Sequence, residues 1–259
     1  MPVVASPPPA RAIVQRAYER LRSYGTPPYV VYLTDENGDR HRIAFRASDE
    51  MMNDSEYYPN DDRLPLARIY RAFVGPLSIT VHESIVKTTP SPGQTAAPAE
   101  NSLVSDLKTI AVVSAYAQPV YTARTAGVET IDGHKTDHVA LAAVSDPSRY
   151  TLRDLWIDTT TYDVWRADYV THDVDVPGST VYLTVNFEPV GPYWIAAHWI
   201  AIYHFLGPQP PVYRELAVLK MRFPATLPGW LWNEHEYERH RRARDPDPLG
   251  GLLEAPPGP

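Results

Sequence analysis

Alternation of apolar and polar side chains is the feature of this sequence that most constrains its fold. In the segment 180–188, TVYLTVNFE, every second residue from Val181 to Phe187 is apolar, and threonine, tyrosine and asparagine stand between them. Successive side chains of a strand point to opposite faces, so this period of two predicts strands with one apolar and one polar face. An antiparallel sheet of such strands must cover its apolar face with a second sheet, with helices, or by closing on itself.

The same period recurs through most of the chain. Short connections rich in Gly, Pro, Asp or Asn separate the segments, and Asn37-Gly38 is a strong hairpin signal. Such connections favour antiparallel neighbours over parallel strands joined by crossover helices. About ten or eleven strands are expected, at residues 29–34, 40–47, 77–86, 110–116, 119–130, 135–144, 152–158, 164–170, 180–188, 193–205 and 212–223.

Only one helix is clearly indicated. Residues 10–24 place Ile13, Ala17 and Leu21 at spacings of four, and Gly25 ends the pattern. A helix of this length spans about 22 Å, which is too short to cover a flat sheet of about ten strands. We therefore expect a mainly β (α+β) fold, in which a curled antiparallel sheet or half-open β-barrel wraps around the N-terminal helix. The alternative is a packed sandwich or barrel whose interior side chains fill the space.

A curled sheet leaves a concave apolar groove, which is a common site for apolar ligands. The residues on the apolar faces of the expected strands are therefore the candidates for the interior and for ligand contact. They are Ile43, Phe45, Ile79, Val81, Leu155, Ile157, Val181, Leu183, Val185, Phe187 and Trp199.

The sequence predicts one folded domain, over residues 10–232. Residues 1–9 are expected to be a disordered lead-in that ends in three prolines. Residues 87–102, KTTPSPGQTAAPAENS, predict a mobile surface loop within the domain. Residues 233–259 are rich in proline and are expected to form a disordered tail.

Charge and composition exclude several classes of protein. The formal net charge of −7 argues against binding of nucleic acid, whose phosphates require a positive field. The absence of cysteine removes disulfides, cysteine-ligated zinc and thiol nucleophiles. No run approaches the roughly 20 apolar residues of a membrane helix, so contact with a membrane is expected to be peripheral at most. The opening MPVVASPPPARA lacks the basic and apolar regions of a signal peptide.

Motifs for catalysis are weak. His134 and His138 share a strand face near two aspartates, but two such ligands more often decorate a solvated face than hold a metal. In NEHEYERH the residue four positions after His235 is Arg239, so the spacing of the zinc-protease motif fails. No phosphate-binding glycine loop and no nucleophile elbow occurs. We expect no enzyme activity, no metal and no cofactor, and we keep a hydrolase or metal-dependent enzyme assembled from the histidines as the least favoured reading.

Aromatic residues concentrate in the segment 151–173, TLRDLWIDTTTYDVWRADYVTHD. It carries Trp156, Tyr162, Trp165 and Tyr169 on what the alternation predicts to be a hairpin. Cross-strand aromatic packing alone would explain these rings. The competing hypothesis is that they line a groove for an apolar ligand.

The segment 131–169, IDGHKTDHVALAAVSDPSRYTLRDLWIDTTTYDVWRADY, resembles the stretch shared by bacterial lipoprotein-sorting carriers of the LolA type. That pattern is a glycine turn, an alternating strand, a variable loop, a strand ending in Asp, a threonine-rich turn and a strand with an early Arg. The opening helix IVQRAYERLRSY, the strands of YVVYLTDENGDRHRIAF and the later TVNFEPVGPYWI fit as well. The matching residues are Gly133, Leu141, Leu155, Trp156, Ile157, Asp158, Thr159 and Arg166.

The resemblance implies a half-open β-barrel with a helix-bearing lid, an apolar cavity for acyl chains, a periplasmic or otherwise extracytoplasmic location, and no catalysis. It assigns ligand-gating roles to no position here. The proline-rich loop, the extra strand at 212–223 and the lack of a visible signal peptide depart from the pattern. The leading hypothesis is a carrier or binding protein for a lipid, a lipidated protein or another hydrophobic molecule. The alternative is an envelope sensor or protein-interaction module, with envelope proteins as partners and no ligand cavity.

Overall fold

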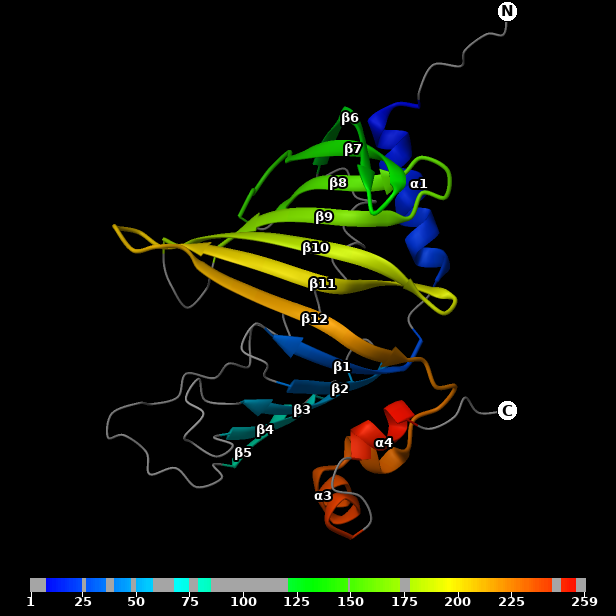
Figure 1. The fold of residues 1–259 in the computed structure, drawn as a ribbon, viewed down its shortest axis with the longest axis vertical. Coiled ribbons are helices and arrows are strands. Elements are labelled where there is room, and N and C mark those ends of the chain that lie inside the picture. Colours follow the sequence, from blue (N-terminus) through cyan, green and yellow to red (C-terminus); the bar gives the residue numbers. More distant parts are fainter. Residues whose placement is uncertain are drawn as a thin grey trace, which may run out of the picture. The chain divides into compact units, whose positions relative to one another are not determined.

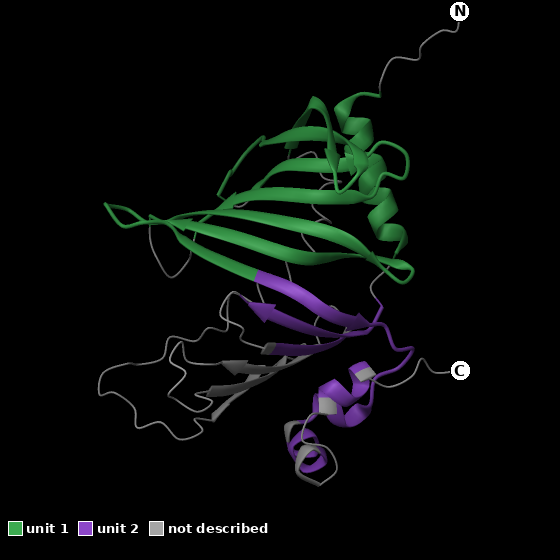
Figure 2. Cartoon of the chain, in the orientation of Figure 1, with its two compact units in different colours: residues 1–25, 96–215 green, residues 26–95, 216–259 purple. Residues whose placement is uncertain are grey.

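The computed structural model describes residues 8–24, 27–35, 40–47, 50–57, 68–74, 79–84, 121–148, 150–172, 178–243 and 248–254. The chain divides into two compact units (Figure 2). Unit 1 contains residues 1–25 and 96–215, and unit 2 contains residues 26–95 and 216–259. The sequence had indicated one domain, whereas both units are built from segments that are distant in the chain.

Unit 1 is an antiparallel sheet with one helix (Figure 1). Its strands lie in the order of the sequence, so each pairs with the next strand along the chain. The helix is α1 (Ala10–Ser23) and the strands are β6 (Tyr121–Ile131), β7 (His134–Ala143), β8 (Leu152–Asp158), β9 (Val164–Thr171), β10 (Thr180–Val190), β11 (Tyr193–His204) and the first four residues of β12 (Val212–Arg222).

Unit 2 is an antiparallel sheet with the order β5-β4-β3-β2-β1-β12. Three short helical segments follow its last strand in the sequence. The elements are β1 (Tyr29–Asp35), β2 (Arg40–Ala47), β3 (Glu50–Tyr57), β4 (Arg68–Val74), β5 (Ile79–Ser84), the remainder of β12, η2 (Gly229–Trp232), α3 (Glu234–Ala243) and α4 (Pro248–Glu254).

The expected fold class is confirmed. The protein is mainly β, its strands are antiparallel, the sheet is curled and open, and an N-terminal helix is present. The described residues form twelve strands, and the two that the sequence did not indicate are β3 and β4. The strand EMMNDSEY of β3 lacks the period of two on which the prediction depended. The strand expected at 110–116 and the loop expected at 87–102 lie outside the described residues.

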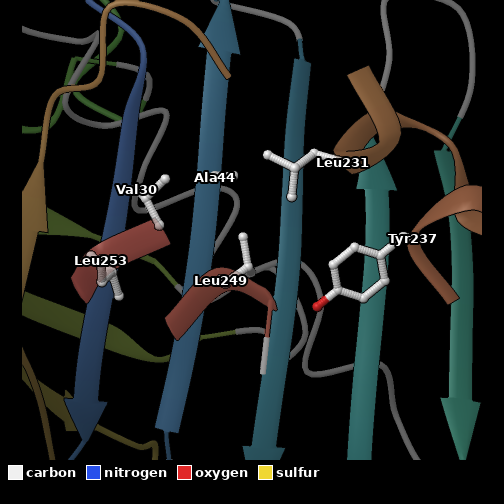
Figure 3. Packing of buried hydrophobic residues seen from close by; sticks show 6 residues of the cluster. All are labelled: Val30, Ala44, Leu231, Tyr237, Leu249 and Leu253. Carbon is white, nitrogen blue, oxygen red and sulfur yellow. The ribbon is translucent and has the colours of Figure 1, made fainter. Parts of the chain in front are cut away.

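The C-terminal segment differs from the expected disordered tail. Helices α3 and α4 lie within residues 233–259, and α4 packs against β1 and β2. One core cluster of unit 2 joins residues of the sheet with residues of η2 and of this segment (Figure 3). Its buried members are Val30, Ala44, Leu231, Tyr237, Leu249 and Leu253. The many prolines indicated disorder, but the spacing of Leu249 and Leu253 is that of a helix with one buried side.

Candidate functional site

A row of apolar side chains crosses five strands of unit 1. Each residue is the direct cross-strand partner of the next, and none is more than 5% exposed. The row consists of Val139, Leu155, Ala167, Val185 and Trp199, from β7 to β11. The alternation of the sequence is therefore realised as a continuous apolar face.

A second apolar row lies beside the first. Leu152 pairs with Tyr169, Tyr169 with Leu183, and Leu183 with Ala201. Leu152 and Tyr169 are buried, whereas Leu183 and Ala201 are only half-buried. At β10 and β11 the second row is thus less completely covered than the first.

A β-bulge brings Leu152 into this row. The pairing of β8 with β9 skips Arg153, because Leu152 pairs with Tyr169 and Asp154 pairs with Asp168. An extra residue of this kind reverses the faces of the side chains on one side of it. Leu152 therefore shares the apolar face with Leu155, although their positions in the sequence differ by an odd number.

Helix α1 covers part of the sheet of unit 1. Its buried residues include Ile13, Val14 and Ala17, and the helix packs mainly against β6 and β8. A helix is only about 10 Å wide, whereas the distance from β7 to β11 is about 19 Å at the usual spacing of strands. One helix therefore cannot cover the whole apolar face.

Hydrogen bonds attach α1 to the turn between β8 and β9. Arg20 Nε donates to Asp163 Oδ1 over 2.9 Å, and the Tyr24 hydroxyl donates to the same oxygen over 2.7 Å. Arg16 donates to the hydroxyl of Tyr162. Burial and the bond to Asp163 raise the pKa of Tyr24 to about 12. We call these contacts the helix latch.

The turn that receives the latch has its own internal support. Asp158 Oδ1 accepts hydrogen bonds from the backbone N–H groups of Thr160 and Thr161, at 2.7 and 2.8 Å. Burial would raise the pKa of Asp158, but these backbone donors, together with side-chain donors of Trp165 and Thr161, outweigh it and the pKa is lowered. Tyr162 has a φ of +63°, a strained backbone angle for a residue with a side chain. The turn thus fixes Tyr162 and Asp163 in the positions from which they bond to α1 and Tyr24.

The opposite face of the same strands carries a polar row. Its members are again successive cross-strand partners, namely His138, Trp156, Arg166, Asn186 and His198. The His138 ring stacks on the Trp156 indole at 4.4 Å between centroids, and the guanidinium of Arg166 lies 4.5 Å from the indole centroid. Because β7 and β9 flank β8, the imidazole of His138 and the guanidinium of Arg166 approach Trp156 from either side.

Carboxylates hold the first half of this row together. Glu129 contacts His138 Nδ1 at 2.8 Å through Oε1 and accepts a 2.9 Å bond from the Trp156 indole through Oε2. Asp154 Oδ1 lies 2.8 Å from His138 Nε2. Asp168 accepts two bonds from Arg166, at 2.9 and 2.7 Å. The imidazole of His138 is therefore fixed by a carboxylate at each ring nitrogen.

A similar arrangement ends the row at β12. Glu215 Oε1 lies 2.5 Å from His198 Nε2, and the Tyr213 hydroxyl donates to Glu215 Oε2 over 2.6 Å. Tyr213 and then His198 lower the pKa of Glu215. In the same way the indole of Trp156, followed by His138, lowers the pKa of Glu129.

Acid is expected to reduce the stabilising effect of Glu129. A carboxylate whose pKa is lowered by folding stabilises the protein above its ordinary pKa and loses this effect as the pH falls through the folded value. The difference in unfolding free energy between wild type and Glu129→Gln should therefore shrink as the pH falls from about 6 to 3. Urea titrations at several pH values measure it. The exposed Glu188→Gln serves as the control, and an equal pH dependence of both differences would contradict the assignment.

The titratable groups of the polar row are bonded within the row. Its histidines and carboxylates bond to one another, and in the part of the chain that the structure describes no three His, Asp or Glu side chains are placed to hold a metal ion. His134 lies apart from His138, because it stacks on Trp165 at 3.9 Å and its Nδ1 is 3.7 Å from Asp158. Asp137 lies on the apolar face as the partner of Ile157, and burial raises its pKa.

The aromatic residues of the hairpin 151–173 are used in packing. Trp165 meets Trp194 edge to face at 4.7 Å, Tyr169 is buried in the second apolar row, and Tyr162 belongs to the latch. Trp156 lies in the polar row. These contacts agree with the packing hypothesis, although the rings do not pair with each other in the way that the alternation suggested.

The predicted interior residues divide between the two units. In unit 1, Leu183 is half-buried and the other members are buried, namely Leu155, Ile157, Val181, Val185, Phe187 and Trp199. In unit 2, Ile43 is buried and Phe45 is half-buried, and both are on β2. Ile79 and Val81 are on β5, and their side chains lie outside the described part of the structure. The members in unit 1 share one face, which makes it the candidate ligand site.

Sequence reasoning missed the carboxylates of the polar row, namely Glu129, Asp154, Asp168 and Glu215. The only available signal was the alternation along each expected strand, which can place these carboxylates on the same face of the sheet as the histidines of neighbouring strands. Pairing requires the register, and bulges at Ala126 and Arg153 shift it within β6 and β8.

No family model and no curated protein matches this chain. Solved structures with a similar fold include an outer membrane lipoprotein-sorting protein domain from Vibrio parahaemolyticus. It is 14% identical with a TM-score of 0.45, over 87% of this chain and 97% of that chain. A DUF1329 family protein from Desulfovibrio piger is 12% identical with a TM-score of 0.46, over 88% and 99%. A LolA superfamily protein from Nitrosomonas europaea is 12% identical with a TM-score of 0.38, over 88% and 99%.

These likenesses concern the fold alone. None of the helices within the described ranges is long and apolar enough to cross a membrane.

Proposed function

We propose that this protein is a non-enzymatic binding protein that holds an apolar ligand, of the class of a lipid acyl chain, on the apolar face of unit 1. The observation that carries this proposal is the second apolar row, which continues the buried face of the first row but stays only half-buried at Leu183 and Ala201. Half-buried Leu183 marks the place where the ligand would enter. An extracytoplasmic location and a lipidated protein as the source of the acyl chain belong to the same proposal.

The affinity would come from removal of apolar surface from water. Each methylene of an acyl chain that leaves water contributes about 0.8 kcal/mol before the costs of ordering. The helix latch is polar and lies at the turn between β8 and β9, so it would orient α1 without occupying the apolar rows.

Uptake of a fluorescent fatty acid tests the proposal. Leu183→Asp places a charge on the apolar face and is expected to weaken uptake at least tenfold, or by about 1.4 kcal/mol. Tyr182→Asp is the matched control, because Tyr182 is the next residue, faces the other side and is 49% exposed. Its uptake should stay close to that of the wild type.

Two outcomes would count against the proposal. The first is equal uptake by folded Leu183→Asp and Tyr182→Asp variants. The second is the absence of lipid in organic extracts of the purified protein together with no uptake by the wild type. If Leu183→Asp fails to fold, Leu183→Ser replaces it, with circular dichroism as the check of folding.

A further inference from the structure

Helix α1 is basic in an acidic chain. Its sequence, ARAIVQRAYERLRS, holds four arginines and one glutamate, whereas the whole chain has a formal charge of −7. Arg11, Arg16, Arg20 and Arg22 are all exposed. The apolar side of the helix is buried, so its arginines form the surface that α1 presents outward from unit 1.

Neighbouring acidic groups neutralise only part of this charge. Asp163 is paired with Arg20 and is itself only 7% exposed. Glu19 accepts a hydrogen bond from Gln15. Arg16 donates to the neutral hydroxyl of Tyr162, so its charge is retained. The exposed surface of α1 therefore keeps an excess of positive charge.

Tyrosine rings hold three of the arginines in place. The guanidinium carbon of Arg16 lies 5.1 Å from the centroid of Tyr162, that of Arg20 lies 4.7 Å from Tyr24, and that of Arg22 lies 5.6 Å from Tyr18. Stacking on a ring leaves N–H groups in the plane of the guanidinium available to an anion. It also reduces the side-chain entropy that binding would cost.

We propose that the exposed side of α1 docks onto an anionic lipid surface, with its arginines on phosphate headgroups. This inference rests on the proposed function, because a carrier of acyl chains must meet the lipid surface from which they come. Phosphate suits the guanidinium fork, and tyrosine interleaved with arginine suits the headgroup region, where one end of the ring is apolar and the other is wet. The negative charge elsewhere on the chain is screened beyond about 8 to 10 Å at physiological salt.

Cosedimentation with vesicles tests the docking surface. The full chain is expected to bind vesicles of phosphatidylcholine with 30 mol% phosphatidylglycerol, to lose this binding at high salt, and not to bind phosphatidylcholine alone. The double variant Arg11→Glu/Arg22→Glu should lower vesicle affinity at least about tenfold. The control Arg214→Glu/Arg239→Glu changes the net charge equally at exposed residues of β12 and α3 and should stay within about twofold of the wild type.

The outcomes separate this inference from the proposed function. Uptake of free fluorescent fatty acid without vesicles should be the same in Arg11→Glu/Arg22→Glu as in the wild type. If the wild type binds anionic vesicles but takes up no fatty acid, only the proposed function is contradicted. Equal vesicle binding by the two double variants would overturn the docking surface. Tighter binding to an immobilised acidic peptide than to the anionic vesicles would also overturn it, in favour of an acidic protein partner. If the glutamate variant fails to fold, Arg11→Gln/Arg22→Gln is used.

Discussion

Leu155→Ala is expected to lower the unfolding free energy of unit 1 by about 3 kcal/mol. Leu155 is 0% exposed and stands in the middle of the first apolar row, between Val139 and Ala167. Neither neighbour can extend into the space that the truncation leaves, so a cavity remains and the cost exceeds the transfer free energy alone. Urea unfolding followed by tryptophan fluorescence measures the change.

The control for this truncation removes the same atoms at an exposed site. Leu206→Ala lies in unit 1, just after β11, and Leu206 is 77% exposed. Its effect should be within about 0.5 kcal/mol of zero. Similar losses for the two variants would show that the apolar row is not the core of unit 1.

Asp163→Ala is expected to release α1 at a cost of about 2 to 3 kcal/mol. The buried carboxylate is the shared acceptor for Arg20 and Tyr24, and its removal leaves two donors without a partner at the latch. Amide hydrogen exchange should accelerate in α1 and much less in β10 and β11. Asp163→Asn keeps an acceptor oxygen, so its effect should fall between those of the wild type and Asp163→Ala.

A conservative pair of tyrosine variants sharpens the test of the latch. Tyr24→Phe removes the bond to Asp163 and should cost about 1 kcal/mol, whereas Tyr18→Phe lies on the same helix and keeps its contact with Arg22. An unchanged exchange rate of α1 in Asp163→Ala would rule out the latch as the attachment of the helix.

Much of the fold was accessible from local patterns. The strand predicted at 152–158 coincides with β8, and the helix predicted at 10–24 differs from α1 by one residue. Both follow from periods of two and of about four, which depend only on neighbouring residues. Strand β3 and the C-terminal helices were not found, because EMMNDSEY has no apolar period and prolines surround the leucines of α4.

The candidate site was accessible only in part. The alternation of apolar and polar residues correctly placed Leu155, Val185 and Trp199 in the interior. It also grouped them with Ile43 and Phe45, which belong to the other unit. Leu152 would have been assigned to the polar face, and the bulge at Arg153 reverses this assignment. A bulge depends on how two strands pair, which a single strand's sequence does not reveal.

The amino-acid sequence by itself determined that the chain is mainly β, that its strands have one apolar and one polar face, and that one amphipathic helix precedes them. Those properties arise between residues a few positions apart. Only the tertiary structure decided that Glu129 and Asp154 bracket His138, that Asp163 receives Arg20 and Tyr24, and that α1 presents arginines held on tyrosine rings. Arg20 and Asp163 are 143 positions apart, and such contacts form only when strand register, bulges and turns bring distant segments together.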